Sequence, residues 1–491
     1  MRRLAIALAT LALALPAVAA GSAGFVPNDP LAVKQWYLNA IHAFDFWPED
    51  PVNDLSPVRV AIVDSGIDLD HPEFAGRILN EQSFVGGDVT DRQGHGTFVA
   101  GIIAATPNNG SGIAGIAFPA QLLIAKVVRA DGTIAPAAEA KAIRWAADNG
   151  ARVINLSLGG LRDPLDPDQD TYSAAEQSAI AYAYSKGAVV VAAVGNADEA
   201  PKTPWHYASY PAALPHVLGV SALAADGTVP MFSIRDKVYN DISAPGVGIV
   251  STLPRSLTAS HPACADQGYS ICGPPEFRPA DGTSYAAAQV SAAAALLIAA
   301  RPSLAPDQVM SILEHSADDV SAATGCVRCP LGRDWYSGWG RLDIATALKA
   351  ALGGPAPPRD RYEGNDEAGN QAFKLYGTRI DVRATLDYWD DNIDVYRVRL
   401  RKGQTMSVWL RGPGGMDTNL ILWRPGTQVV EAPSIGQQAA LQTWRLTQSA
   451  HVGPNEHLLH RARASGWYYV EVKLTTQGSG QYRLHISKTA S

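Results

Sequence analysis

The sequence predicts an α/β domain with a parallel sheet covered by helices on both faces, followed by an antiparallel β-sandwich. Short apolar, β-branched runs alternate with helix-like stretches between residue 58 and about residue 352, a pattern typical of a parallel sheet. Beyond residue 361 the apolar residues recur at every second position between glycine-rich turns. That period of two indicates strands with one buried face.

The individual elements of the first domain follow from its apolar runs. We expect strands at 58–63, 122–128, 153–158, 189–194 and 217–222, and helices at 135–149 and 174–186. Another helix is expected to begin at His95, and a long one to run from Ser284 through Ala300. The latter is apolar nearly all round, which predicts a buried helix. Ligands of such sheets bind outside the carboxyl ends of the strands.

The composition excludes some classes of protein. Of the 491 residues, 47% are hydrophobic and 18% are charged, which excludes a wholly disordered chain. The net charge is −7 and no long basic run occurs, which argues against a dedicated nucleic-acid binder. The predicted organisation is a signal peptide at 1–20, the α/β domain with its N-terminal extension at 21–352, a linker at 353–361 (GGPAPPRDR) and the sandwich at 362–491.

The first twenty residues have the layout of a secretory signal peptide. Arg2 and Arg3 precede an uncharged apolar stretch, which ends at the small-residue site 17–19 (AVA). The apolar run is shorter than the ~20 residues that span a bilayer, so the alternative of a membrane anchor is weaker. We therefore predict an exported protein, extracellular or associated with the cell surface, without a transmembrane segment once the signal is removed.

The four cysteines fit an oxidising compartment. Each pair lies within one loop, which favours the disulfides Cys264–Cys272 and Cys326–Cys329 among the three possible pairings. The alternative is that the C-x-x-C spacing forms half of a zinc site. No second C-x-x-C and no H-x-x-x-H is present to complete that site.

Four polar residues stand where an α/β domain places its chemistry. Asp64 ends the first predicted strand, and Asn196 follows the fourth through a glycine. His95 and Ser284 each begin a predicted helix. Taken singly, each residue also has an ordinary role as a turn residue, a helix cap or an exposed side chain. Free backbone N–H groups at the start of the helix beside Ser284 suit a developing oxyanion.

Five segments in order resemble the subtilisin-like serine peptidases, or subtilases. They are VAIVDSGID, GHGTFVAGIIAA, VINLSLGG, VVVAAVGN and GTSYAAA, and the resemblance covers about residues 58–352. It implies a subtilisin-like fold with Ser284 as nucleophile, His95 as general base and acid, and Asp64 orienting the imidazole. It also implies that Asn196 and the Ser284 N–H form the oxyanion hole.

The same resemblance implies the walls of the S1 pocket. Two segments match them and would pair with an extended substrate: Ser157, Leu158 and Gly159, and Ala193, Val194 and Gly195. Their small side chains predict broad specificity with apolar or aromatic P1 residues. The pattern departs from the family at Tyr285 (usually Met), at Ala288-Gln289 (usually Pro-His) and at Phe98 (often His). None of these residues does the chemistry, so we expect altered packing rather than lost activity.

The family's other accessories are matched less closely. Only 37 residues separate Gly21 from Pro57, so an inhibitory prodomain is expected to be absent. Glu73 and Asn109, the latter in the segment 108–115, resemble the family's calcium ligands with one extra residue in the loop. They remain weak candidates for a structural calcium site. The Asp-rich loop at 161–171 is expected to be solvated surface, with substrate selection or calcium binding as alternatives.

The C-terminal sandwich resembles the bacterial pre-peptidase C-terminal domain. The segments that carry the likeness are 363–366, 391–396, 403–404 and 466–470. Such a domain is expected to bind a cell surface or insoluble substrate, or only to stabilise the enzyme or be trimmed off. Some such domains bind calcium through acidic residues near the Asn-Asp and Asp-x-x-Asp stretches, but solvated turn carboxylates are favoured here.

The resemblance as a whole implies a secreted serine endopeptidase that hydrolyses peptide bonds through an acyl-enzyme, with protein substrates and no cofactor required for chemistry. The alternative is a non-catalytic secreted binding or adhesion protein with a peptidase-like fold. A third possibility is a dedicated processing peptidase with one partner, against which the open S1 walls argue mildly.

Overall fold

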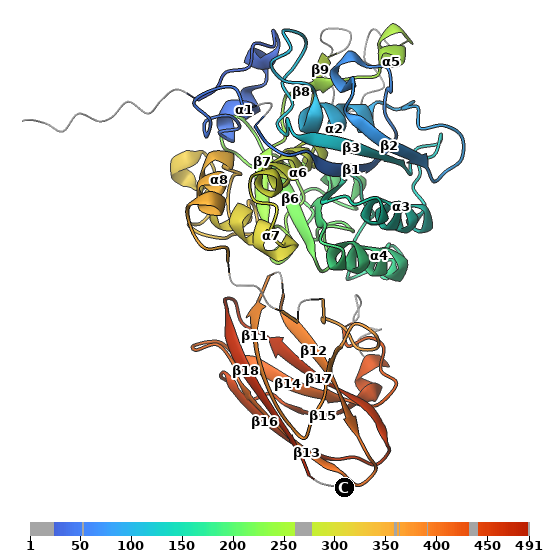
Figure 1. Ribbon diagram of the computed structural model, residues 1–491, viewed down its shortest axis with the longest axis vertical. Helices are drawn as coiled ribbons and strands as arrows, with labels where there is room; N and C mark the ends of the chain where they lie inside the picture. Colours follow the sequence, from blue (N-terminus) through green and yellow to red (C-terminus); the bar gives the residue numbers. More distant parts are fainter. Residues whose placement is uncertain are drawn as a thin grey trace, which may run out of the picture.

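The computed structural model describes residues 24–51, 54–260, 277–357, 361–362, 364–389, 391–431 and 440–489. An α/β domain is followed by a β-sandwich, which lies below it in Figure 1. This architecture confirms the predicted fold class. The predicted signal peptide and Cys264–Cys272 lie outside the described residues.

A seven-stranded parallel sheet forms the centre of the first domain. Its order is β2-β3-β1-β4-β5-β6-β7. The inner strands are buried because their apolar residues are covered on both faces. The strands are β1 (Val58–Asp64), β2 (Ile78–Ser83), β3 (Ala120–Lys126), β4 (Val153–Leu156), β5 (Val189–Ala193), β6 (Val217–Leu223) and β7 (Ile242–Pro245).

Helices cover the sheet on both faces. On one face the central helix α6 packs on five strands and on α2, α7 and α8, and on the other α3 packs against α4. The helices are α1 (Trp36–Ala40), α2 (His95–Ala104), α3 (Pro136–Asp148), α4 (Ala174–Ser185), α5 (Arg255–Ser260), α6 (Thr283–Ala300), α7 (Pro306–His315) and α8 (Ile344–Gly353). Short 3₁₀ turns are η1 (Ala32–Lys34), η2 (Pro72–Phe74), η3 (Ala197–Glu199), η4 (Ala322–Thr324) and η5 (Gln442–Trp444).

One described helix, α6, is apolar and long enough to cross a membrane by composition alone. However, 89% of it is buried inside the protein. It is therefore the core helix of a folded domain, as predicted from the apolar residues on all of its sides. Because α6 packs on the sheet, Ser284 in the first turn of this helix lies at the edge of the sheet.

The sandwich consists of two packed sheets. One has the order β10-β12-β17-β14-β15 and the other β11-β18-β13-β16. The pairs are antiparallel except β10 with β12, which run parallel because the chain crosses to the other sheet between them. The strands are β10 (Phe373–Leu375), β11 (Arg379–Asp387), β12 (Ile393–Leu400), β13 (Thr405–Arg411), β14 (Thr418–Trp423), β15 (Arg445–Ser449), β16 (Asn455–Arg461), β17 (Gly466–Leu474) and β18 (Ser479–Lys488). A further two-stranded pair, β8 (Ile249–Thr252) with β9 (Phe277–Ala280), belongs to the first domain.

Specific side-chain contacts join the two domains. His216 Nε2 lies 2.6 Å from Asp366 Oδ2, and the same imidazole stacks on Tyr184 at 4.0 Å between ring centroids. The guanidinium of Arg333 lies 4.8 Å above the ring of Trp389. Among the described residues, the sandwich therefore contacts the first domain through Asp366 on His216 and through Trp389, which packs against Arg333 and against Trp339 at 5.6 Å between ring centroids.

One disulfide is present among the described residues, and it joins Cys326 to Cys329. Both cysteines are buried beside Leu223 and Val320. This is one of the two pairings that the loop positions favour. The zinc alternative loses its ligands because both sulfurs are used in the disulfide.

Candidate active site

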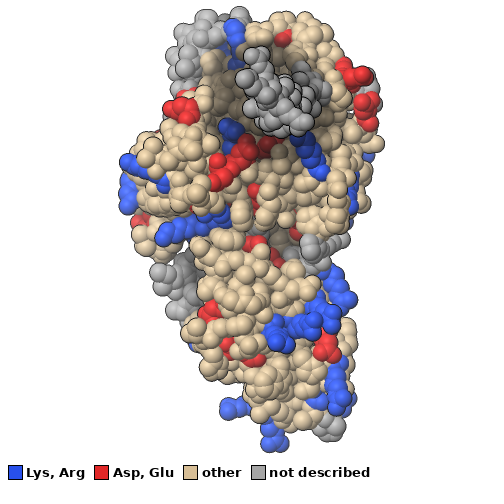
Figure 2. Space-filling model, turned by 90° about the vertical axis from the view of Figure 1, so that its left-hand side faces the viewer, with Lys and Arg blue, Asp and Glu red and all other residues tan. Residues whose placement is uncertain are grey.

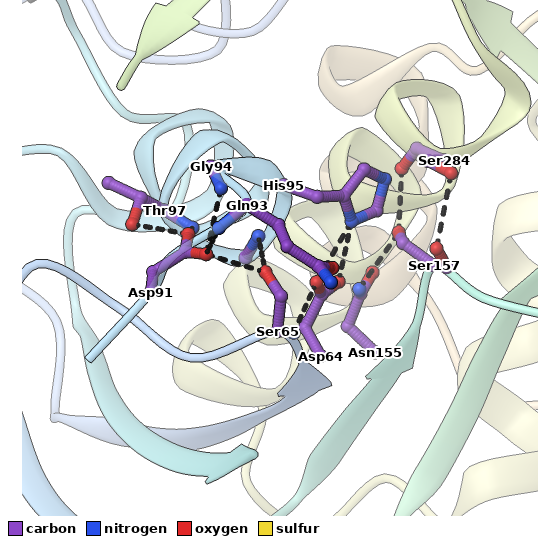
Figure 3. Close-up of polar contacts among 11 residues, drawn as sticks. Asp64, Ser65, Asp91, Gln93, Gly94, His95, Thr97, Asn155, Ser157 and Ser284 are labelled. Carbon is purple, nitrogen blue, oxygen red and sulfur yellow. Dashed lines mark hydrogen bonds and ion pairs between the residues drawn. The ribbon is translucent and has the colours of Figure 1, made fainter. Parts of the chain in front are cut away.

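His95 and Asp64 meet at the carboxyl edge of the sheet. Asp64 is the last residue of β1 and is buried, while His95 begins α2. His95 Nδ1 lies 2.9 Å from Asp64 Oδ1 and 3.0 Å from Oδ2. In Figure 3 the imidazole lies between Asp64 and Ser284. Because Nδ1 donates to the carboxylate, the imidazole in this contact leaves Nε2 to accept a proton.

Asp91 fixes the start of α2, and with it His95. The N-cap of this helix is Gly94 at φ 96°, which has no side chain to cap the first turn. The buried Asp91 does so instead: Oδ1 accepts from Gly94 N at 2.8 Å, and Oδ2 accepts from Thr97 N at 2.9 Å. Ser65 links Asp91 to the catalytic strand, since its Oγ donates to Asp91 Oδ1 at 2.8 Å.

Ser284 is the second residue of α6 and is largely buried. Its Oγ donates to Ser157 O at 3.1 Å, and Ser157 Oγ donates to Ser284 O at 2.7 Å. Asn155 Nδ2 donates to Ser157 Oγ at 3.0 Å, and Ser291 Oγ donates to Asn155 Oδ1 at 2.8 Å. This buried chain of hydrogen bonds ties the first turns of α6 to β4 (Figure 3).

Asn196 lies beside Ser284. Its Oδ1 accepts from Thr283 N at 3.1 Å and from Thr283 Oγ1 at 3.0 Å. Those two bonds fix the amide with its oxygen toward the helix start and leave Nδ2 as a donor. The backbone N–H of Ser284 belongs to the first turn of α6, where N–H groups have no partner within the helix. Two donors are thus available beside the serine hydroxyl.

The two predicted S1 segments follow neighbouring strands, β4 and β5. Ser209 lies between them: a Cβ added to Gly195 would lie 2.3 Å from Ser209 Oγ, and one added to Gly159 would lie 3.2 Å from Ser209 Cβ. The main chain of Val194 is already bonded to Val220 O and Ser209 N. Leu158 and Gly159 form no main-chain hydrogen bond with another described residue, so the predicted pairing of this segment with an extended substrate meets no competing partner there.

The departures at Tyr285 and Phe98 form one contact. Their ring centroids lie 4.4 Å apart, and the Tyr285 ring lies 5.8 Å from that of His95. Burial raises the pKa of the Tyr285 phenol, so this hydroxyl is neutral. Gln289, where the family usually has His, donates to Pro245 O at 2.6 Å and to Tyr285 O at 3.0 Å.

The calcium candidates lie elsewhere, beneath the loop at 108–115. Glu73 is buried, and the loop approaches it closely: a Cβ on Gly112 (φ 47°) would lie 1.9 Å from Glu73 Oε1. Burial raises the pKa of Glu73 to about 7, and the nearby carboxylate of Asp29 contributes. Among the described residues, only long donor contacts, of 3.4 and 3.5 Å, reach the Glu73 carboxylate, whereas Asp29 already accepts from Asn108 N at 2.7 Å and from Asn109 N at 3.1 Å. Carboxylate oxygens are the kind of ligand that Ca²⁺ prefers. Asn109 instead turns its Nδ2 toward Glu73, at 3.5 Å, while its Oδ1 accepts from Ser111 N.

The aspartates of the loop at 161–171 form hydrogen bonds with backbone groups of the same loop. Asp163 Oδ1 accepts from Leu165 N and Asp166 N, and Asp170 Oδ2 accepts from Asp163 N. Thr171 N returns to Leu161 O at 2.9 Å. These aspartates therefore serve as turn acceptors, in line with the expected surface loop.

Three residues of the site are not among those predicted from the sequence: Asp91, Asn155 and Ser209. Asn155 is the one that the sequence marks, since it is a polar residue inside an apolar strand. Asp91 precedes His95 by four residues in a polar stretch, and Ser209 is one of many exposed-looking serines. Their roles depend on contacts with distant segments.

Comparison with known proteins decides the family. The sequence model of the subtilase family matches residues 56–340.

The chain belongs to the subtilase family. Thermitase from Thermoactinomyces vulgaris is 35% identical over 301 residues, which cover 60% of this chain and 93% of thermitase. Subtilisin DY from Bacillus licheniformis is 32% identical over 294 residues, which cover 60% of this chain and 91% of that protein. A solved protease structure from Pseudoalteromonas arctica PAMC 21717 matches with a TM-score of 0.52 and 27% identity, over 67% of this chain and 100% of that chain.

Membership of the subtilases makes this chain a serine endopeptidase, which acts on protein or peptide substrates. The subtilase match ends at residue 340, and the sandwich lies outside it. The likeness of the sandwich to pre-peptidase C-terminal domains therefore stays a prediction.

Proposed function

We propose that Ser284, His95 and Asp64 are the catalytic triad of this endopeptidase. The observation that carries the proposal is the pair of contacts from His95 Nδ1 to the buried Asp64 carboxylate, on the helix that faces Ser284. Asp64 orients the imidazole and stabilises its protonated form. His95 Nε2 then accepts the Ser284 hydroxyl proton, after the hydroxyl turns away from Ser157 O.

The reaction proceeds in two stages. Ser284 Oγ bonds to the scissile carbonyl carbon while His95 takes the hydroxyl proton, and the carbonyl oxygen becomes an oxyanion that accepts from Ser284 N–H and Asn196 Nδ2. Collapse breaks the C–N bond, and His95 gives its proton to the leaving amine. Water then hydrolyses the acyl-enzyme by the same route, with His95 as base, and frees Ser284.

Specificity is proposed to be broad, with apolar or aromatic P1 residues. The proposal rests on the likeness of the two S1 segments to the family, with glycine at 159 and 195. The space that a Cβ would take at each glycine is occupied by Ser209, which makes Ser209 a candidate to limit the size of the P1 residue. A peptide-library cleavage profile tests this preference. Ser209→Gly is expected to enlarge the range of P1 residues, whereas cleavage restricted to one sequence would favour a dedicated processing peptidase.

A structural calcium ion is proposed beneath the loop at 108–115, held by Glu73 and Asp29. Their carboxylates supply oxygen ligands, and the donors around Glu73 are long contacts of 3.4 and 3.5 Å. Addition of calcium is expected to raise the melting temperature of the wild type, and EDTA to reverse this. Glu73→Gln removes one ligand charge and is expected to abolish the calcium response. A melting temperature of the wild type that is indifferent to both calcium and EDTA would contradict the site.

Export and surface attachment complete the proposal. The signal-like residues 1–20 support secretion, and the additional sandwich supports binding to a cell surface or an insoluble substrate. Mass spectrometry of the secreted chain is expected to find a new N-terminus near Gly21. An uncleaved chain retained in the membrane fraction would favour the anchor instead.

The decisive test is labelling of residues 21–491 with a fluorophosphonate, beside Ser284→Ala. Labelling of the first alone, together with casein hydrolysis, is the expected result. The Asn196→Ala variant is expected still to react with the fluorophosphonate, but its kcat is expected to fall about 10²–10³-fold. This is the loss known for removal of an oxyanion-hole donor in subtilisin. If folded wild-type protein neither labels nor hydrolyses casein, the non-catalytic binding protein is the better account.

A further inference from the structure

The two sheets of the sandwich differ in what covers their outer faces. Outside the five-stranded sheet, other segments of the chain pack on it in a second apolar cluster, which includes Trp423, Val430 and Trp444. The outer face of the four-stranded sheet carries no such cluster among the described residues. Its strands alternate cleanly, with buried residues such as Val408 and Leu484 inward and exposed ones outward. We call this outer surface the β13 face.

An exposed tryptophan lies near the middle of the β13 face. Trp409 is 56% exposed and stacks on His457 of the neighbouring strand, with ring centroids 3.8 Å apart. In the strand register, His485 lies opposite Trp409 on the other side, and Asp381 lies opposite His485. Leu459, on the edge strand, is 66% exposed. Trp409 and Leu459 thus expose apolar surface on a face that no other described segment covers with an apolar cluster.

A row of arginines crosses the sheet beside Trp409. Arg383, Arg483 and Arg411 lie directly opposite one another on three adjacent strands. All three are exposed, and none forms an ion pair with a described residue. The face also carries Arg379 and Arg461, against the acidic residues Asp381 and Asp387. Figure 2 shows basic side chains together with acidic ones on the sandwich, and the whole chain has a net charge of −7.

Such a row is not explained by the sandwich's own stability. Like charges directly opposite each other on a sheet are destabilising. Charges on edge strands protect against aggregation, but Arg483 and Arg411 lie on the two inner strands, β18 and β13. An anionic partner would neutralise the row, because guanidinium groups bind carboxylates through paired hydrogen bonds.

We propose that the β13 face binds a linear acidic polysaccharide, a polyuronate with a carboxylate on each sugar. The arginine row binds the carboxylates, Trp409 and Leu459 contact the apolar faces of the sugar rings, and hydroxyls bond to the polar side chains between them. The apolar ring faces that a sugar chain offers to Trp409 and Leu459 favour a glycan over the phosphate backbone of a nucleic-acid duplex. The acidic Asp381 on the same face is already paired with His485 Nδ1, at 2.7 Å. The proposal deepens the surface-binding role proposed above and does not depend on the peptidase activity.

The test uses the full secreted chain, residues 21–491, with Ser284→Ala to prevent self-cleavage. Binding to sodium alginate is measured by affinity electrophoresis and by titration at two salt concentrations. Wild-type binding is expected to weaken with salt. The double variant Arg411→Gln/Arg483→Gln and the single variant Trp409→Ala are each expected to weaken binding about tenfold or more. The matched control is Arg399→Gln, an exposed arginine on β12 of the other sheet, which is expected to change binding less than about twofold.

Several outcomes would overturn the proposal. These are no binding to alginate, equal weakening by Arg399→Gln, or binding to double-stranded DNA as tight as to alginate at the same salt. Binding to insoluble protein that the face variants leave intact would keep the surface-binding role but place it elsewhere. The same face variants, made with Ser284 intact, are expected to cleave a short soluble peptide like wild type, which shows that they fold and separates this test from that of the peptidase.

Discussion

Tyr285 and Phe98 occupy the space beside His95 in which many subtilases have a methionine and a second histidine. The two departures compensate each other, because the rings pack at 4.4 Å and Tyr285 also contacts the imidazole. A large, buried ring next to a catalytic histidine restricts its orientation and excludes water. We therefore propose that Tyr285 positions His95 and is not itself catalytic, since its neutral hydroxyl has no step to perform.

Removal of the Tyr285 ring is expected to lower kcat while leaving substrate affinity in place. Tyr285→Ala leaves a cavity beside His95, and we expect kcat to fall about tenfold or more with KM within about twofold. Tyr285→Phe keeps the ring and is expected to be close to wild type. Steady-state kinetics on a soluble peptide separate the two constants. A kcat of Tyr285→Ala equal to that of Tyr285→Phe would show that the ring does not position His95.

At the scale of elements, the site consists of two helix starts brought to one sheet edge. The start of α2 is held by Asp91 and Ser65, and the start of α6 by Ser157, Asn155 and Ser291. Close packing adds to this: a Cβ on Gly96 would lie 2.2 Å from Gly66 O. The two proposed catalytic residues at these helix starts, His95 and Ser284, are thus each held by a buried polar network.

Asp91→Ala is expected to destabilise the domain and to lower kcat together. It leaves the N–H groups of Gly94 and Thr97 and the hydroxyl of Ser65 without their acceptor in a buried site, at a cost of about 1–3 kcal/mol or more. Asp88→Ala is the control, since Asp88 is an exposed partner of Arg92 and such pairs contribute little. Urea unfolding and kcat measure both effects. Equal stability of the two variants would contradict the capping role of Asp91.

At the scale of the whole molecule, the α/β domain and the sandwich each have their own core, and they meet at contacts such as that of His216 with Asp366. The sandwich carries buried carboxyls of its own. Burial raises the pKa of Glu471 to about 8. The hydrogen bond from Trp423 lowers this pKa, and the nearby carboxyl of Glu367 raises it. Burial also raises the pKa of Glu367 to about 8. Both groups therefore hold their protons in the folded sandwich at a pH at which the unfolded chain has lost them.

The sandwich is consequently expected to lose stability as pH rises from about 4.5 to about 8. Within that window the folded state binds more protons than the unfolded state, so the free energy of unfolding falls by about 1.4 kcal/mol per pH unit for each such group. Below about pH 4.5 the stabilisation is fully present. Glu471→Gln is expected to reduce the slope. Calorimetry at several pH values resolves the sandwich transition, and an unchanged slope in the variant would contradict the assignment.

The sequence predicted the inner strands of the sheet but not all of its edges. Runs such as 58–63 and 189–194 were recognisable because fully buried strands are continuously apolar. The edge strand β2 escaped notice because its residues ILNEQS are mostly exposed and follow no apolar period. The other edge, β7, is only four residues long. Both strands owe their conformation to pairing with a neighbour.

The sequence by itself determined the order of the elements, the family and the residues that stand at strand ends and helix starts. These are properties of local periodicity and of motifs a few residues long. Only the tertiary structure decided which side chains meet: Asn155 with Ser291, 136 positions apart, Ser209 between two glycines, His216 with Asp366, and a row of arginines beside Trp409. Such contacts join segments that are far apart in the sequence. Bringing these segments together costs chain entropy, and this cost is met only when the core packs.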